Sequence, residues 1–209
     1  MARTRSQDYD SVKQSILDCA AKLFATKGFA STSINEIAAA SGLSKAGVYH
    51  YFDSKSEILR TMLTEHLETV TEIVDTALNT SESPRSKFLT FTRLLIDNYS
   101  RPATRNQHAV LMSRDMDSLP SKDREFVATT ERRIVRATDR LLQNIHPQLE
   151  KHPDFTRPLT MLYFGMINWT DHWYSEKGRL APAELAALVA ELFLYGMAHT
   201  DYSAIHTRN

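Results

Sequence analysis

The stretch from Thr32 to Phe52 constrains the fold more than any other part of the chain, because it predicts two short helices joined by a tight turn. Ser33 and Glu36 have the spacing of a capping box, in which hydroxyl and carboxylate satisfy free backbone N–H groups at a helix start. Gly42 stands where the chain must turn through a left-handed conformation. Ser44 is then placed to cap the second helix. The stretch therefore predicts a helix-turn-helix.

The second of these helices offers an outer surface suited to a DNA major groove. Val48 and Phe52 are spaced to face inward, as in closely crossing helices. Small outer residues let a helix enter a groove, while hydroxyl and imidazole groups can bond to phosphates or touch thymine methyls. The outward set is Ser44, Lys45, Ala46, Gly47, Tyr49, His50 and Tyr51. The alternative is an ordinary helical hairpin whose exposed tyrosines have no function.

The composition is that of a soluble globular protein with uneven charge. The chain has 209 residues, of which 42% are hydrophobic and 24% charged, and its formal net charge is +0. Up to residue 60 there are 8 basic and 6 acidic side chains, a local charge of +2. A uniformly basic nucleic-acid binder is therefore excluded, and the asymmetry gives mild support for an N-terminal DNA surface.

Several features predict a cytoplasmic protein without metal or cofactor. Cys19, the single cysteine, cannot form an internal disulfide and lies in an apolar helical stripe. No apolar run is long enough to span a bilayer, and residues 1–15 lack a signal-peptide core. Isolated structural or surface roles are expected for the scattered histidines His66, His108, His146, His152, His172, His199 and His206.

The whole chain predicts an all-α fold of about nine helices. Residues 1–8, with Arg3 and Arg5, have the character of a loose arm that either lies in a minor groove or has no function. A helix over about 9–27 should end at Gly28. Ser54 and Glu57 predict a second capping box. Further helices are expected at about 55–78, 85–100, 103–118, 121–145, 156–175 and 182–200.

The last two expected helices are apolar on more than one side. Tyr163 and Phe164 fall on different stripes of one, and Leu192 and Phe193 on different sides of the other. A helix that is apolar nearly all round must be buried all round. We therefore expect a homodimer through these two helices. The chain would comprise a helix-turn-helix domain, 1–53, and a ligand-binding and dimerisation domain, 54–209.

A set of short motifs extends from residue 28 to residue 59: Gly28-Phe29, Thr32-Ser33-Ile34, Ile37-Ala38, Ser41-Gly42-Leu43-Ser44-Lys45, Tyr49-His50-Tyr51-Phe52 and Ser54-Lys55-Ser56-Glu57-Ile58-Leu59. This set closely resembles TetR-family transcriptional regulators. The resemblance implies DNA contacts from Thr32 and Ser33, from Ser44 to Tyr51, and from Lys55 to a phosphate. The order Ala46-Gly47 departs from the commoner glycine-threonine pair, which leaves base contacts at these two positions open.

The run from Leu162 to Thr170, with Trp173-Tyr174 and Glu191-Leu192-Phe193-Leu194, resembles a TetR subgroup whose effectors are acyl-CoA thioesters. An acyl group would need a lined cavity, and CoA phosphates would need cations at its mouth. Cavity candidates are Phe88, Leu95, Tyr99, Met112, Met116, Met161, Phe164, Asn168 and Trp169. Cation candidates are Arg101, Arg105, Arg114, Arg132, Arg133 and Arg136. Core packing is the alternative for the apolar candidates, and surface solvation for the arginines.

These observations predict a homodimeric repressor that binds a palindromic operator and is released by a small hydrophobic effector, with an acyl-CoA thioester as the first choice. A multidrug or antibiotic sensor controlling an efflux gene is the alternative within the same family. An enzyme is disfavoured, because the chain lacks a Walker loop, a nucleophile elbow and zinc-binding motifs.

Overall fold

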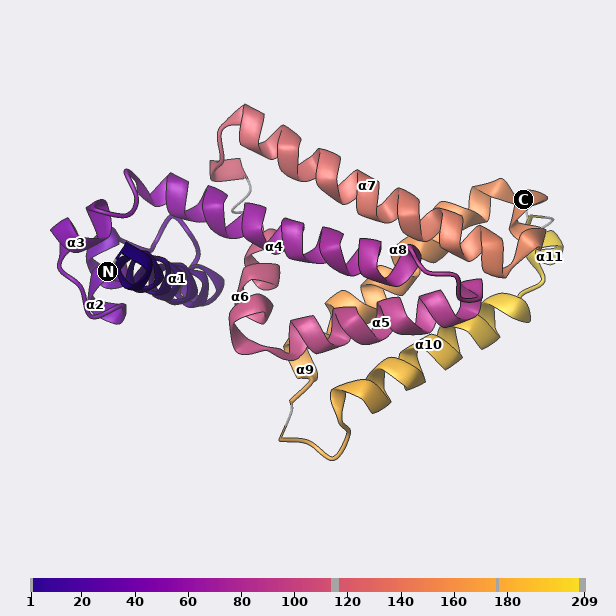
Figure 1. Ribbon diagram of the computed structural model, residues 1–209. Helices are drawn as coiled ribbons and strands as arrows, with labels where there is room; N and C mark the ends of the chain where they lie inside the picture. Colours follow the sequence, from indigo (N-terminus) through magenta and orange to yellow (C-terminus); the bar gives the residue numbers. More distant parts are fainter. Residues whose placement is uncertain (1, 114–116, 176, 207–209) are drawn as a thin grey trace. The chain divides into compact units, whose positions relative to one another are not determined.

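The computed structural model describes residues 2–113, 117–175 and 177–206, and all regular elements in these ranges are helical. The α-helices are α1 (Ala2–Lys27), α2 (Ile34–Ala40), α3 (Lys45–Tyr49), α4 (Lys55–Leu78), α5 (Pro84–Ser100), α6 (Pro102–Leu111), α7 (Ser121–Ile145), α8 (Thr156–Asn168), α9 (Thr170–Trp173), α10 (Pro182–Ala198) and α11 (Tyr202–His206) (Figure 1). Two 3-10 helices, η2 (Pro147–Glu150) and η3 (Pro153–Phe155), precede α8. The expected all-α fold is confirmed. None of the described helices combines the length and apolar character that a membrane span requires.

The expected loose arm at the N-terminus is wrong, because α1 begins at Ala2 and carries Arg3 and Arg5 on a helix. The residues before Tyr9 lack an apolar stripe, but they also lack proline and glycine, so nothing in them opposes helix formation. The missing periodicity indicated the absence of a packed face. It did not indicate the absence of a helix.

Two other expected helices end early, each where a hydroxyl bonds to the backbone of the last turn. The helix expected over 103–118 stops at Leu111, and Ser113 Oγ donates to the Val110 carbonyl at 2.7 Å. The helix expected over 156–175 breaks at Trp169 into α8 and α9, where Thr170 Oγ1 donates to the Ile167 carbonyl at 2.7 Å. Such local bonds compete with the helical ladder.

The predicted caps of the helix-turn-helix are present. Ser33 Oγ accepts from the Glu36 N–H at 3.3 Å, and Glu36 Oε2 accepts from the Ser33 N–H at 2.8 Å. Gly42 has φ +70°, the left-handed conformation that its position requires. Ser44 Oγ accepts from the Gly47 N–H at 3.0 Å. Local chemistry therefore determines both helix starts and the turn between them.

The second predicted capping box is present in a shifted form. Ser54 Oγ accepts from the Glu57 N–H at 3.1 Å, as expected. The Glu57 carboxylate, however, accepts from the Asp53 N–H at 2.6 Å, one residue before the expected donor. The cap at the start of α4 therefore also fixes the residue that follows Phe52.

The chain divides into two compact units. The first unit comprises Met1–Glu68 and Pro102–Thr129, and the second comprises Thr69–Arg101 and Thr130–Asn209. The long helices α4 and α7 each contribute to both. This division differs from the expected boundary after residue 53, because the first part of α4, α6 and the first part of α7 belong to the same unit as α1–α3.

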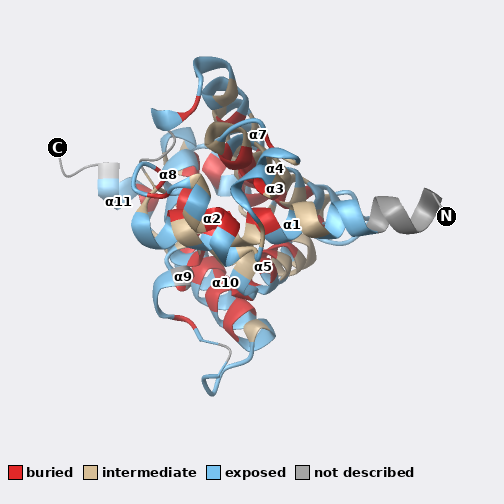
Figure 2. Cartoon of the chain, turned by 90° about the vertical axis from the view of Figure 1, so that its left-hand side faces the viewer, coloured by how far each residue is buried: buried red, intermediate tan, exposed pale blue. Residues whose placement is uncertain are grey.

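Each unit has its own core. In the first unit, α1 buries Ile16, Leu17 and Phe24, and it packs against α2 and α6. In the second unit, α5 packs along α10, and Figure 2 shows buried residues on both helices. An aromatic cluster lies there: the Tyr163 ring centroid is 4.7 Å from that of Phe88, and the Tyr163 hydroxyl is 2.9 Å from Thr92 Oγ1.

Candidate DNA interface and effector site

The short helix α3 has a buried side and an exposed side, as its sequence predicts. Val48 and Phe52 are buried in the first unit. On the other side, Ser44, Lys45, Ala46, Tyr49 and His50 are exposed, while Gly47 and Tyr51 are half-buried. The structure therefore brings these seven residues together on one surface that combines hydroxyls, a cation and aromatic rings. These are groups that bond to phosphates and base edges.

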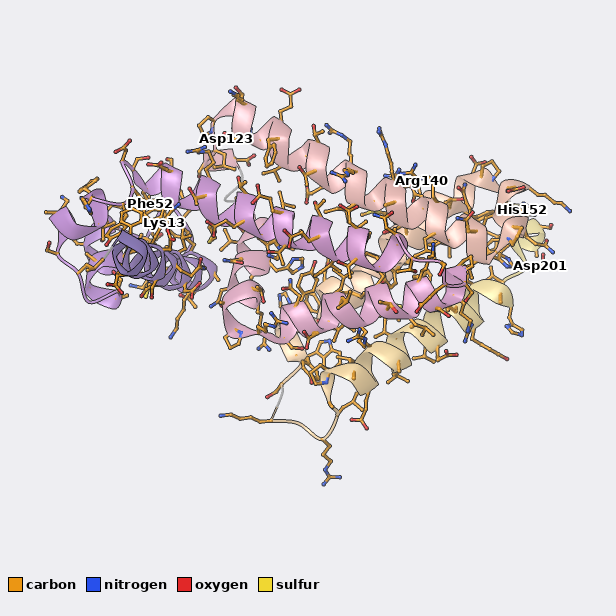
Figure 3. The ribbon with its side chains drawn as sticks, in the orientation of Figure 1. Lys13, Phe52, Asp123, Arg140, His152 and Asp201 are labelled. Atoms are coloured by element: carbon orange, nitrogen blue, oxygen red, sulfur yellow. The ribbon has the colours of Figure 1, made fainter. Side chains whose placement is uncertain are left out.

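Tyr9 of α1, which was not among the expected DNA contacts, extends this surface. Its ring centroid lies 4.7 Å from that of Tyr51 and 6.2 Å from that of His50. One turn further along α1, Lys13 Nζ lies 5.7 Å from the ring centroid of Phe52 (Figure 3). The start of α1 therefore supports the end of α3. The position of Tyr9 three residues before Val12, in line with the apolar stripe of this helix, was the available sequence signal.

The two residues expected to contact DNA before α2 differ in position. Thr32 is buried, and its hydroxyl donates to the Gly28 carbonyl at 2.9 Å, which closes the turn between α1 and α2. Ser33 is exposed at the start of α2. The Lys27 ammonium at 2.6 Å, followed by the Ser33 N–H, lowers the pKa of Glu36 to about 2, so the capping carboxylate stays ionised. Of the two, only Ser33 presents its side chain at the surface.

Lys55 has partners inside the protein. Its Nζ donates to the carbonyl oxygens of Phe29 at 2.6 Å and Thr32 at 2.7 Å, and it lies 4.3 Å from the centroid of the Phe29 ring. The lysine thus joins the start of α4 to the turn between α1 and α2. A DNA phosphate would have to compete with these bonds for the same ammonium.

We expect Lys55→Met to lower the free energy of unfolding by about 1.5–3 kcal/mol, because it removes charge-assisted hydrogen bonds from carbonyl groups that are partly buried. Urea unfolding followed by circular dichroism measures the change. Lys45→Met, at an exposed position on α3, is the control and should leave stability nearly unchanged. Unchanged stability in Lys55→Met, together with a shallower salt dependence of operator binding, would instead assign Lys55 to a phosphate.

Two histidines expected to be isolated form a buried pair in the first unit, so that expectation is wrong for them. His66 on α4 is 1% exposed and His108 on α6 is 2% exposed. His66 Nε2 and His108 Nδ1 are 3.4 Å apart. Burial, and then the neighbouring His108, lower the pKa of His66 to about 3. Within residues 2–113, 117–175 and 177–206 no group of three or more metal-ligating side chains occurs.

The low pKa of His66 makes stability depend on pH. Between its ordinary pKa of 6.5 and about 3, the unfolded chain binds a proton that the folded chain does not. The neutral imidazole therefore makes its full contribution to the free energy of unfolding above pH 6.5. Below that pH the contribution falls by about 1.4 kcal/mol per pH unit. We expect His66→Gln to lose less stability than the wild type between pH 6.5 and pH 5 in urea unfolding. His199→Gln, an exposed control, should retain the wild-type slope, and the same slope in His66→Gln would contradict the assignment.

The structure places the described members of the expected effector site in different surroundings. Phe88, Leu95, Tyr99 and Phe164 are buried in the core of the second unit, and Asn168 is half-buried. Met161 and Trp169 are exposed on α8, and Met112 is exposed in the first unit. Met116, like Arg114, lies outside the described residues. The two apolar stripes expected on α8 are wrong in their membership, because Tyr163 and Phe164, placed on different stripes, are both buried, while the exposed residues come from both stripes.

The exposed apolar residues of α8 belong to an apolar surface on the last two long helices. On α8, Met161, Leu162 and Trp169 are 53%, 63% and 61% exposed, and they border a shallow depression of about 670 Å³. On α10, Leu188, Leu192 and Tyr195 are exposed as well. Large apolar patches of this kind mark sites of association.

Known families cover most of the chain. Residues 16–62 match the family described as "Bacterial regulatory proteins, tetR family", and residues 81–197 match "Tetracyclin repressor-like, C-terminal domain". The chain belongs to the TetR family. The resemblance noted in the sequence is thereby confirmed, and with it a DNA-binding transcriptional regulator.

Individual TetR-family relatives agree with this assignment. A TetR-family regulator from Bordetella parapertussis 12822 is 35% identical, with 88% of this chain and 94% of that chain covered and a TM-score of 0.82. The transcriptional repressor KstR2 of Mycolicibacterium smegmatis is 23% identical over 91% of this chain and 93% of its own. AibR, solved in complex with isovaleryl coenzyme A and operator DNA, has a TM-score of 0.72 at 24% identity, with 88% of this chain and 98% of AibR covered. The likeness to AibR shows the fold alone.

Proposed function

We propose that this protein is a cytoplasmic, homodimeric TetR-family repressor that binds a palindromic operator through α3 and releases it when an acyl-CoA thioester binds. The observation that carries the proposal is the exposed face of α3 over its buried Val48. Each recognition helix would enter a major groove, with the half-sites separated by whole helical turns. Ser33, Ser44, Lys45, Tyr49 and His50 supply the side chains best placed to reach DNA.

The apolar surface on α8 and α10 supports the homodimer. A two-fold interface pairs the same surface of both subunits, and this surface offers exposed leucines, methionines and aromatic rings for that purpose. Covering Leu162, Trp169 and Leu192 with a second copy would remove their apolar area from water. The domain core alone leaves that area exposed.

An acyl-CoA thioester is the effector that the sequence motifs favour, and AibR shares the fold and binds a compound of that class. The aromatic cluster around Phe88 and Tyr163 supplies an apolar environment in the second unit. To relieve repression, the ligand must bind the DNA-incompetent conformation more tightly, by about 5.5 kcal/mol for a nearly complete switch.

We expect Tyr49→Ala to weaken binding to an operator selected from random DNA by about 5- to 150-fold, the loss of about 1–3 kcal/mol typical of a base or groove contact. Fluorescence anisotropy measures the affinity, and circular dichroism checks the fold. Wild-type affinity in a folded Tyr49→Ala protein would refute the assignment of α3.

Isovaleryl-CoA and longer acyl-CoA esters should release the operator, whereas the free acids should not. Release by free acids or lipophilic cations would favour a drug sensor.

The proposed dimer interface leads to a separate prediction. Leu192→Glu places a charge in the proposed interface, so we expect monomers in sedimentation velocity and at least tenfold weaker operator binding. Leu180→Glu introduces the same charge at a partly exposed position before α10, outside the apolar surface, and should remain dimeric. A dimeric Leu192→Glu protein would place the interface elsewhere.

A further inference from the structure

A groove with a basic rim lies within the second unit, between the last turns of α4, the start of α5 and the second half of α7. Its volume is about 400 Å³. Val74, Leu78 and Leu141 supply apolar side chains to its lining, of which Val74 and Leu141 are buried. Lys87, Arg133 and Arg140 supply cations. Arg133 was among the cations expected for coenzyme A phosphates, but Lys87 and Arg140 were not, because the groove joins residues from three helices.

The cations of the groove exceed its anions. Asp75 is the only carboxylate among its lining residues, and its Oδ2 lies 3.5 Å from Arg133 Nη2, with both side chains more than half exposed. An ion pair of this length and exposure contributes little to stability, so the guanidinium of Arg133 remains available to bind an anion. Lys87 Nζ donates one bond, to the Leu78 carbonyl at 2.9 Å, and an ammonium group has three donors.

Among the cations of the groove, Arg140 has the most hydrogen-bond donors left for a ligand. It is exposed on α7 (Figure 3), and within the described part of the chain its guanidinium has neither an ion pair nor a hydrogen bond. By contrast, Arg85, Arg101 and Arg157 of the same unit each reach a carboxylate at 2.7 Å. The groove therefore contains guanidinium donors that the protein itself does not use.

The spacing of these arginines suits a ligand with more than one phosphate. Arg133 and Arg140 are seven residues apart, about two helical turns, so they lie on one face of α7, and both are exposed. A guanidinium fork matches the oxygens of a phosphate in a bidentate manner. The adjacent Val74 and Leu141 offer apolar contact to an uncharged part of the same molecule.

We propose that this groove binds the pyrophosphate or phosphate ester of a nucleotide-like ligand, with Arg133 and Arg140 holding the phosphates. The nucleotide part of coenzyme A carries this chemistry, and choosing it as the first ligand rests on the proposed function. A free nucleotide or inorganic phosphate carries the same charged groups. Binding to the groove itself requires neither operator DNA nor an acyl chain.

The test uses the full chain and three probes: free coenzyme A, ADP and inorganic phosphate, each titrated by calorimetry. We expect coenzyme A to bind, with affinity falling as salt rises. Arg133→Gln and Arg140→Gln should each weaken binding at least tenfold. Asp75→Asn, which removes the carboxylate of the groove, should strengthen it. Arg93→Gln is the matched control, because Arg93 is an exposed arginine of α5 outside the groove.

The probes distinguish the sources of the phosphate. Equal affinity for coenzyme A and ADP would support a general nucleotide site, and equal affinity for phosphate alone would support a free-anion site. Binding of none of the probes, or unchanged affinity in both arginine variants, would overturn the inference. If the groove inference fails in this way but acyl-CoA still releases the operator from both arginine variants, the proposed function remains valid. If wild-type protein binds coenzyme A in the groove but acyl-CoA leaves the operator bound, the inference stands and the proposed effector fails.

Discussion

The ammonium group of Lys55 connects the helix-turn-helix to the rest of its compact unit. Its bonds to the Phe29 and Thr32 carbonyls satisfy acceptors in a turn that has no helical partners for them. The same turn positions Ser33, whose capping box starts α2 and so determines where the crossing helices meet. One ammonium group thereby links the start of α4 to the placement of α2 and α3. Buried Val48 and Phe52 then fix the side that α3 presents.

The parts of the structure that sequence could predict are those determined locally. The caps at Ser33 and Ser44 and the left-handed Gly42 involve residues within a few positions of one another, and all three are as expected. The exposed face of α3 followed from the inward spacing of Val48 and Phe52. The prediction of a loose arm before Tyr9 was wrong because a helix can form without an apolar stripe where no proline or glycine opposes it.

The features that sequence could not predict depend on contacts between distant residues. His66 and His108 are separated by 42 residues, and nothing in their spacing indicates that their rings meet. The groove of Arg133 and Arg140 requires α4, α5 and α7 to converge. On α8 apolar residues nearly surround the helix, so only tertiary packing reveals that Tyr163 and Phe164 face the core while Trp169 faces solvent. Of the expected effector-site residues that the structure describes, Phe88, Leu95, Tyr99 and Phe164 are therefore core residues, whereas Met112, Met161 and Trp169 are exposed.

The histidine pair has a consequence for the polarity of hydrogen bonding across the first unit. A neutral imidazole donates from one nitrogen and accepts at the other, so the bond between His66 Nε2 and His108 Nδ1 can run in either direction. If His66 donates, its Nδ1 is an acceptor and His108 Nε2 is a donor. If His108 donates, both outer nitrogens exchange these roles. A reversal of the bond between the rings therefore exchanges donor and acceptor at the outer nitrogen of each ring. The hydrogen-bonding role of a nitrogen on α4 is in this way coupled to that of a nitrogen on α6, without movement of either helix.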